Sequence, residues 1–295
     1  MNTPPGRPIR IGFGSLKGGT GKSTLAEITA SYLCFTEGLR LFVVDCDYSQ
    51  YSFFGLRERD KQTVQNGEPA LQARMKKHFE ALGREAYRVI KSTAARAEED
   101  VRRFIAERAG ETFDLILFDL PGRADDPGLV ELTLGMDYLI SPIEPDRQSL
   151  VASMTYAPAI RDLGVSDDRC RIKEIYLVWN KIDRRVRTDV IAFYNEVIKR
   201  EGLGLFDTQL PRSARFKKEL TADGRPAFRS TYLPPDKSLI EGSGIESFVK
   251  EFIEKCNLKT ARPRPSKNSV VGESPSGFSK WQATMCRPSR PKKHR

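Results

Sequence analysis

The sequence predicts an α/β fold, a mostly parallel, doubly wound sheet with helices on both faces. Short, nearly continuous apolar segments alternate along the chain with stretches whose apolar residues recur at three- and four-residue steps. Such apolar segments are typical of parallel strands that are buried on both faces. A glycine-rich loop joins the first apolar segment to the first helical stretch, which is the context expected of a phosphate-binding site.

Five apolar segments are expected to form strands of this sheet. Their ranges are Pro8–Ser15, Leu41–Asp45, Asp114–Asp119, Tyr138–Ile143 and Glu174–Trp179. A further short strand is expected before Leu210. Their length and their separation by helical stretches predict crossover connections between parallel neighbours.

Apolar periodicity predicts two helices in the first part of the chain. One is expected over Lys22–Thr36. The other lies in the long charged stretch Arg57–Gly110 and is expected to be amphipathic, with its charged face in solvent. The apolar residues that predict this second helix are Ala86, Val89, Ile90, Ala94, Ala97, Val101, Phe104 and Ile105.

The positive charge of the chain is concentrated near its C-terminus. The net charge is +10, and residues 257–295 hold ten Lys or Arg and one acid, so residues 1–256 are nearly neutral. This segment is rich in Pro, Ser, Arg and Lys and poor in aliphatic residues, a composition typical of disorder. We therefore expect an ordered domain over 1–256 and a disordered basic tail over 257–295.

Composition excludes several classes of protein. No apolar run approaches the roughly 18 residues of a membrane-spanning helix, and the first residues lack the apolar core of a secretory signal. The five cysteines are scattered without a CxxC pair, which argues against a zinc ribbon or a cysteine-held iron–sulfur cluster. Unpaired, scattered cysteines fit a reducing compartment, so a cytoplasmic location is expected.

The glycine-rich loop carries the residue types that bind a nucleoside triphosphate. Its glycines let successive backbone N–H groups turn toward an anion at the start of a helix. In this type of loop the lysine reaches the β- and γ-phosphates, and the next hydroxyl binds Mg²⁺. The nucleotide-binding residues expected here are Lys17, Gly18, Gly19, Thr20, Gly21, Lys22, Ser23 and Thr24.

The loop departs from the general P-loop pattern at one position and carries an additional lysine. Leu16 stands where that pattern has glycine, and a second lysine, Lys17, precedes the glycines. This arrangement resembles the deviant Walker A motif of the ParA/MinD family of ATPases. The resemblance implies an ATP-dependent homodimer in which Lys17 reaches the phosphates bound by the other subunit, as an arginine finger does. The alternative is that Lys17 helps to bind nucleotide within its own chain.

Acidic residues at strand ends extend the resemblance. The segment from Asp45 to Gln50 is similar to the D-x-D-P-Q segment of the family, with Tyr48 and Ser49 where proline is usual. By resemblance, Asp47 orients or activates the attacking water. Asp45 and Asp119, the latter of the Walker B type, would support Mg²⁺ together with Ser23.

The identity of the base is open between two interpretations. The spacing of Asn180 and Asp183 equals that of the N-K-x-D motif by which GTPases recognise guanine. In the ParA/MinD family the equivalent strand end supplies an asparagine for adenine, and the loop with Pro211 and Arg212 resembles the second base-flanking loop. The lysine and D-x-D signals favour ATP, in which case Asp183 could simply pair with a neighbouring arginine.

A narrower resemblance links the chain to ParA-like ATPases of the conjugal-transfer TraA type. It is carried by the segments DCDYSQYS, SPIEPDRQSL and Phe228–Ser243, within a family match over about residues 8–256. The resemblance implies a slow ATPase that a ParB-like or transfer-apparatus protein stimulates. Its role would be partitioning, positioning or conjugal transfer of a DNA element, with possible association with the nucleoid.

Two basic clusters are candidates for non-specific binding to DNA phosphates. The residues are Arg184, Arg185 and Arg187 in one cluster and Arg215, Lys217 and Lys218 in the other. A solvated helix face is the alternative for either cluster. The basic tail is a further anion-binding candidate. Its apolar residues Phe278, Trp281 and Met285 also leave open a MinD-like membrane-cycling ATPase, which the short segment and its flanking prolines disfavour.

Overall fold

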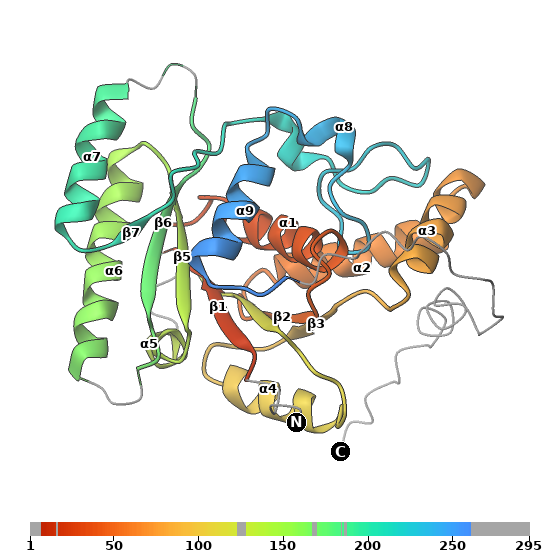
Figure 1. Ribbon diagram of the computed structural model, residues 1–295, viewed down its shortest axis with the longest axis horizontal. Coiled ribbons are helices and arrows are strands. Elements are labelled where there is room, and N and C mark those ends of the chain that lie inside the picture. The colour runs from red at the N-terminus through yellow and green to blue at the C-terminus, as the bar shows by residue number, and fades with distance from the viewer. Residues whose placement is uncertain are drawn as a thin grey trace.

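The computed structural model describes residues 7–15, 17–122, 128–166, 170–183, 185 and 188–260. Within these ranges the chain forms a seven-stranded sheet in the order β3-β2-β4-β1-β5-β6-β7, with every neighbouring pair parallel (Figure 1). The strands are β1 Ile9–Phe13, β2 Leu41–Asp45, β3 Arg88–Lys91, β4 Leu115–Asp119, β5 Tyr138–Ile143, β6 Glu174–Trp179 and β7 Gly204–Leu205. The expected α/β class is confirmed.

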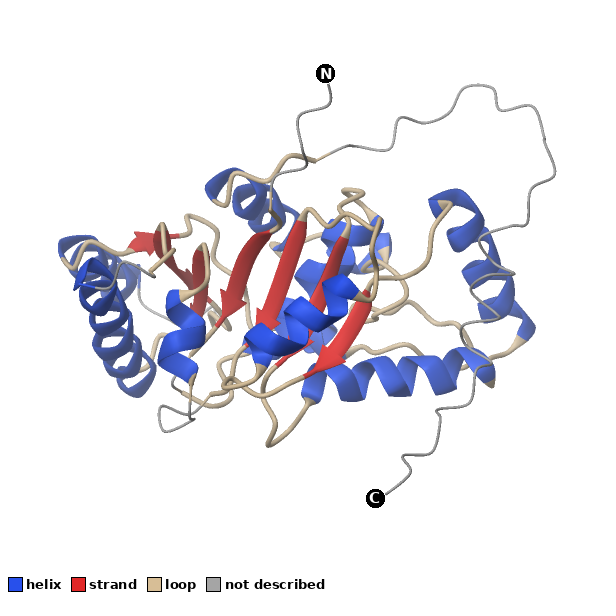
Figure 2. Ribbon diagram, turned by 90° about the horizontal axis from the view of Figure 1, so that it is seen from below, coloured by secondary structure: helices blue, strands red, loops and turns tan. Residues whose placement is uncertain are grey.

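Helices cover both faces of the sheet (Figure 2). One face packs against α1 Lys22–Phe35, α2 Ser52–Gln65, α3 Pro69–Leu82 and α9 Ile245–Lys255. The other face packs against α4 Ala97–Ala106, α5 Leu129–Leu134, α6 Arg147–Ser166 and α7 Thr188–Arg200. Two short elements, the 3₁₀ helix η1 Ala214–Lys217 and α8 Lys237–Ile240, lie in the segment before α9.

The last helix is held by aromatic packing against the central strand. Phe248 and Phe252, one turn apart on α9, are fully buried. The ring of Phe252 stacks on Phe13 of β1 at 6.0 Å, and that of Phe248 lies 5.0 Å from Phe206. Burying each such side chain contributes about 1.5–3 kcal/mol, so α9 anchors the C-terminal segment under the site.

The prediction of one amphipathic helix over residues 86–105 is wrong in its first half. Val89 and Ile90 belong to β3, which pairs with β2 and lies at the edge of the sheet. The helix, α4, begins only at Ala97, and Glu98, Glu99 and Asp100 occupy its first turn. Adjacent β-branched residues favour a strand, and acids favour a helix N-terminus, so both signals were present in the sequence.

The other expected strands and the first helix are confirmed to within one or two residues. The strand expected before Leu210 is the two-residue β7. The division into a domain and a tail at residue 256 stays a prediction, since residues 261–295 lie outside the described part. Leu258 is still buried against the core. Within the described residues, no helix is long and apolar enough to cross a membrane.

Candidate functional site: a nucleotide cavity

The site lies at the carboxyl ends of three adjacent parallel strands. Phe13 at the end of β1 is level with Asp119 at the end of β4, and Asp119 is level with Asp45 at the end of β2. The loop after β1 therefore emerges beside both carboxylates. In open α/β sheets this crevice outside the strand ends is where ligands bind.

The phosphate loop is shaped by left-handed glycines. Gly19 and Gly21 have φ values of 81° and 92°, and Gly21 precedes the first residue of α1. A Cβ atom at Gly21 would also lie only 2.5 Å from the Asn180 side-chain nitrogen. Glycine is thus required at position 21 both by conformation and by close approach, and the exposed N-terminus of α1 is suited to bind an anion.

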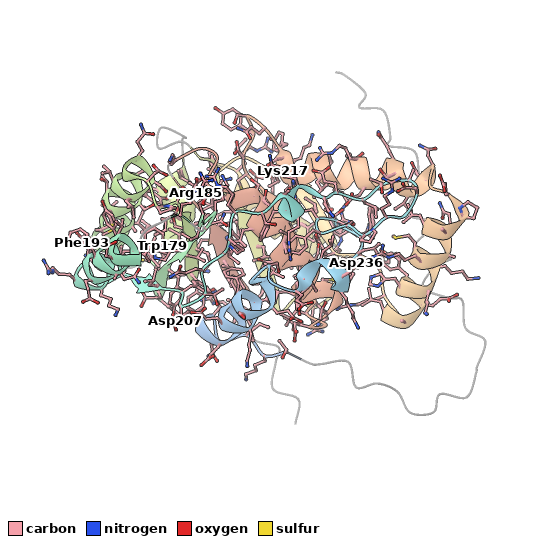
Figure 3. All side chains as sticks on the ribbon, turned by 90° about the horizontal axis from the view of Figure 1, so that it is seen from above. Trp179, Arg185, Phe193, Asp207, Lys217 and Asp236 are labelled. Atoms are coloured by element: carbon pink, nitrogen blue, oxygen red, sulfur yellow. The ribbon has the colours of Figure 1, made fainter. Side chains whose placement is uncertain are left out.

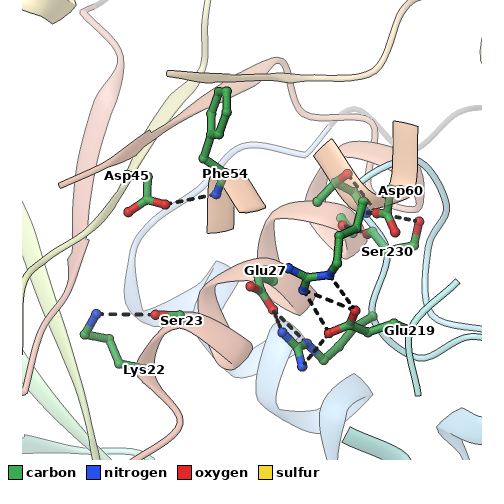
Figure 4. Close-up of polar contacts among 12 residues, drawn as sticks. Lys22, Ser23, Glu27, Asp45, Phe54, Asp60, Glu219 and Ser230 are labelled. Atoms are coloured by element: carbon green, nitrogen blue, oxygen red, sulfur yellow. Dashed lines mark hydrogen bonds and ion pairs between the residues drawn. The ribbon is translucent and has the colours of Figure 1, made fainter. Parts of the chain in front are cut away.

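Lys22 is surrounded by the acids that the sequence singled out. Its Nζ lies 2.7 Å from Asp119 Oδ1 and 3.7 Å from Asp47 Oδ2. Burial lowers the pKa of Lys22, but the neighbouring carboxylates, Asp119 first, more than offset it, so the pKa is raised. A permanent cation is therefore held beside the phosphate loop, and its hydrogen bond to Ser23 Oγ points it along that loop (Figure 4).

Asp45 and Asp47 have different surroundings. Asp45 is fully buried and accepts backbone N–H groups from Asp47 and Phe54 at 3.2 and 2.9 Å. Burial and the charge of Asp119 raise the pKa of Asp45 to about 7. Asp47 faces the cavity, where it accepts a hydrogen bond from the Ser49 hydroxyl at 2.7 Å. Asp45 thus shapes the loop, and Asp47 is the acid that a ligand can meet.

Two buried oxygens at this end of the site have no hydrogen-bond partner. They are Asp119 Oδ2 and Thr20 Oγ1. These oxygens and the Ser23 hydroxyl are hard oxygen donors, the ligand type that Mg²⁺ prefers. In the described part of the chain, no three His, Cys, Asp or Glu side chains form a metal cluster. An ion held here would therefore need phosphate or water oxygens as further ligands.

Lys17 is paired within its own chain. Its Nζ lies 2.7 Å from both carboxylate oxygens of Asp146, which directly precedes α6. Burial raises the pKa of Asp146, but the hydrogen bond from Lys17 outweighs it and the net pKa is lowered. Both side chains remain partly exposed, at 27% and 40%. The pair is thus an accessible contact at the mouth of the site.

The strand ends β5 and β6 hold the phosphate loop from the other side. Asn180 Nδ2 donates to the Thr20 carbonyl at 2.7 Å, and Lys181 Nζ donates to the Gly19 carbonyl. Lys181 also pairs at 2.9 Å with Glu144, which lies 3.7 Å from Arg212 as well. The sequence assigned Asn180 to base recognition, and in this structure its amide nitrogen positions the loop.

These parts enclose one cavity of about 680 Å³, which is large enough for a nucleotide. Every described residue of the expected nucleotide-binding set lines it, from Lys17 through Thr24 together with Asn180, Pro211 and Arg212. Asp45 and Asp119 are not among the residues that line it. Leu16 is outside the described residues.

The expected DNA-binding residues differ in their surroundings. Lys217 lines the mouth of the cavity, and Lys218 follows it in an exposed position. The Arg215 guanidinium instead donates to the backbone carbonyls of Leu239 and Glu241, which fixes η1. Arg185 is exposed in the loop after β6, and its backbone N–H is accepted by Asp183; Figure 3 labels Arg185 and Lys217. Arg184 and Arg187 lie outside the described part.

Comparisons with known proteins agree with this geometry. The family model described as ATPase MipZ matches residues 9–151, which contain the phosphate loop and the three acids. An uncharacterised ATP-binding protein of Methanocaldococcus jannaschii is 24% identical over 268 residues, or 83% of this chain and 95% of that protein. The chain is thus similar to an ATPase family over its first half and to an ATP-binding protein over most of its length.

Two solved structures with the ParA/MinD fold are similar at low identity. A putative plasmid partition protein of Borrelia burgdorferi, bound to AMPPNP, gives a TM-score of 0.54 at 17% identity, over 85% of this chain and all of that one. The structure of pNOB8 ParA bound to nonspecific DNA gives 0.52 at 15% identity, over 85% and 99%. At these identities the likeness shows the fold.

Two residues of the cavity wall were not predicted from the sequence. Glu27 on α1 and Arg229, in the segment before α8, form an ion pair in the cavity wall. Glu27 lies four residues after Ser23 and so shares its helix face, which was an available signal. Arg229 gives no comparable signal, since 202 residues separate it from Glu27.

Proposed function

We propose that this chain binds ATP with Mg²⁺ and hydrolyses it slowly. The observation that carries the proposal is Lys22, a buried cation held by acids at the start of α1, beside a cavity of nucleotide size. Asp119 lies 2.7 Å from Lys22 and supplies the negative charge beside it. An incoming triphosphate supplies the same negative charge together with acceptors for the loop N–H groups.

The site residues divide into binding and reaction roles under this proposal. Ser23 and Asp119, supported by Asp45, would hold Mg²⁺, which when bound neutralises phosphate charge. Asp47 faces the cavity and would orient the attacking water. Pro211 and Arg212, with Asn180 across the cavity, would flank the adenine.

We further propose an ATP-dependent homodimer that binds DNA non-specifically. Lys17 lies at the mouth of the site and is free to exchange its partner Asp146 for phosphate oxygens bound by a second subunit. Lys217 and Lys218 lie beside the same mouth, so dimerisation would bring two basic clusters together. The similar structure of pNOB8 ParA bound to nonspecific DNA supports the proposal of DNA binding. Hydrolysis, stimulated by a ParB-like or transfer-apparatus protein, would release both DNA and the second subunit.

The biological role proposed is partitioning or positioning of a DNA element. The similar Borrelia protein is itself named a putative plasmid partition protein. Conjugal transfer of the TraA type is the finer proposal, and it depends on the three sequence segments that carry that resemblance.

Sizing and DNA binding with no nucleotide, ADP and ATP test the proposal in one experiment. We expect a monomer without ATP and a dimer with ATP that binds duplexes of unrelated sequence equally. Lys17→Ala should bind ATP yet remain monomeric. A chain that stays monomeric with ATP, or a Lys17→Ala variant that dimerises normally, would contradict the dimer proposal. Measuring how DNA affinity depends on salt, for the full chain and for a chain without residues 257–295, shows what the tail adds.

GTP is a second candidate substrate because of one observation in the structure. Asn180 and Lys181, in the loop after β6, donate hydrogen bonds to carbonyls of the phosphate loop. Asp183 lies three residues after Asn180 in this loop after β6, and it is exposed. A carboxylate there could accept hydrogen bonds from a guanine edge. Competition between ATP and GTP, measured for the wild type and for Asp183→Ala, decides which nucleotide is the substrate. A preference for ATP in both proteins excludes recognition of guanine by Asp183.

A further inference from the structure

The wall of the nucleotide cavity contains a charged pair that the proposed roles leave unexplained. Glu27 is completely buried, and its Oε2 accepts from Arg229 Nε at 2.7 Å and Nη2 at 2.6 Å. Arg229 Nη1 lies 3.3 Å from Glu219, which in turn pairs with Arg59 (Figure 4). Glu27 and Arg229 line the cavity.

The second oxygen of Glu27 has no partner. Glu27 Oε1 is buried and makes no hydrogen bond in this structure. An unsatisfied buried oxygen destabilises a protein unless something supplies its partner. Since Arg229 engages only Oε2, the lining of the cavity contains a buried carboxyl oxygen without a partner, beside a guanidinium.

The position of the pair limits which part of a nucleotide it can meet. Glu27 follows Ser23 by one helical turn, about 6 Å along α1, on the same face. The phosphates belong at the N-terminus of that helix, and the base belongs between Asn180 and Pro211. The pair therefore faces the part of the ligand that lies between phosphates and base.

Hydrogen-bonding capacity then decides which group of the nucleotide fits the pair. Phosphate oxygens only accept hydrogen bonds, so they suit Arg229 but not the Glu27 carboxylate. A hydroxyl both donates and accepts, and can satisfy Arg229 and Glu27 Oε1 together. This holds whether Glu27 is ionised or protonated, because a hydroxyl can donate to a carboxylate or accept from a carboxylic acid.

We propose that Glu27 and Arg229 form a subsite for the ribose hydroxyls of the bound nucleotide. The inference rests on the proposed function, since it requires a nucleotide in this cavity. It assigns to this chain a preference for ribonucleotides over deoxyribonucleotides. Arg229 is the contacting cation, and Glu219 holds its outer side.

The test compares the affinities of ATP, 2′-deoxy-ATP and 3′-deoxy-ATP for the full chain by calorimetric titration. Wild type should bind ATP at least ~10-fold more tightly than one of the two analogues, because the missing hydroxyl leaves buried groups unpaired. In Glu27→Val/Arg229→Leu, which replaces the pair by apolar residues, the ratio should fall to within about twofold. Arg59→Met, which removes only the outer cation of the same network, should keep the wild-type ratio.

Equal binding of the three nucleotides by wild type would overturn the inference without any variant. So would a double variant, shown by thermal unfolding to be folded, that still discriminates as wild type does. If the double variant does not fold, Glu27→Met replaces it, because methionine offers no acceptor or donor of comparable strength, and an unchanged ratio in that folded variant would also overturn the inference. Failure of wild type to bind ATP at all would instead remove the proposed function, so the two failures are distinguishable.

Discussion

The two walls of the nucleotide cavity are built in different ways. The phosphate wall, residues 17–24 with Asp45, Asp47 and Asp119, consists of strand ends and a helix start that the parallel sheet aligns. The base wall, residues 180–181 and 211–217 with Arg229, consists of loops and the short 3₁₀ helix η1. Those loops are fixed by side-chain contacts such as Lys181 to Glu144 and Arg229 to Glu27.

The difference separates what a fold supplies from what an individual chain supplies. Strand order alone brings the phosphate-wall acids together, so any sequence with this sheet can place them. The base wall depends on ion pairs between residues that are distant in the sequence, such as Glu27 and Arg229. Such a pair forms only where the chain carries both of its residues. We therefore expect chemistry to depend on the phosphate wall and selectivity to depend on the base wall.

Lys22→Ala should give the largest effect. Losing this cation removes charge-assisted hydrogen bonds to the phosphates, and ATP affinity should fall by about 10³-fold. Asp119 is then left buried without its partner, so thermal stability should fall as well. Lys181→Ala is the matched base-wall control, and titration should show a loss of no more than about tenfold. Equal losses of ATP affinity in the two variants would contradict the proposed difference between the phosphate wall and the base wall.

Asp47→Ala should lower turnover by at least ~10²-fold while leaving ATP affinity nearly unchanged, because its role is to orient water in the reaction. Single-turnover hydrolysis and equilibrium titration measure the two quantities separately. Asp183→Ala, which removes an acid of the base-wall loop, serves as the control and should turn over ATP at the wild-type rate. Normal hydrolysis by the Asp47 variant would move the role to Asp45.

Glu27→Gln should change how stability depends on pH. Burial raises the pKa of Glu27 to about 8, against the opposing effect of Arg229. Because the folded chain holds this proton more tightly than the unfolded chain, the free energy of unfolding falls as pH rises between about 4.5 and 8. Between pH 6 and 8 this amounts to about 2 kcal/mol, and the variant should lack it. Denaturation curves at the two pH values measure the change in the free energy of unfolding. An equal change in wild type and variant would contradict this prediction.

Asp146→Asn should give the smallest effect. The pair with Lys17 is partly exposed, and such pairs contribute about 0–1 kcal/mol. Stability should therefore change little, while freeing Lys17 should strengthen the ATP-dependent dimer by a few-fold. Analytical ultracentrifugation with ATP measures this, and a weaker dimer would show that Asp146 assists rather than restrains Lys17.

Sequence reasoning located the phosphate wall almost completely and the base wall only in outline. Lys22, Asp47 and Asp119 lie in motifs of fixed local spacing, and the strands that carry them read as apolar runs. The spacing of Val89 and Ile90 fits a helix, but their adjacent β-branched side chains favour the strand that pairs with β2, and the prediction gave that signal too little weight. The partners Glu27 and Arg229 could not be paired, because a contact across 202 residues leaves no local pattern.

The order of strands has a consequence for how the chain folds during synthesis. β1 is the first strand made, yet its two neighbours in the sheet are β4 and β5, so Ile11 waits for Leu117 on one side and Tyr138 on the other. About half of the chain must therefore leave the ribosome before β1 is paired on both edges. Until then an apolar strand has open edges, the form most prone to aggregation. A fragment that ends before β5 should consequently depend on chaperones, however complete its phosphate loop is.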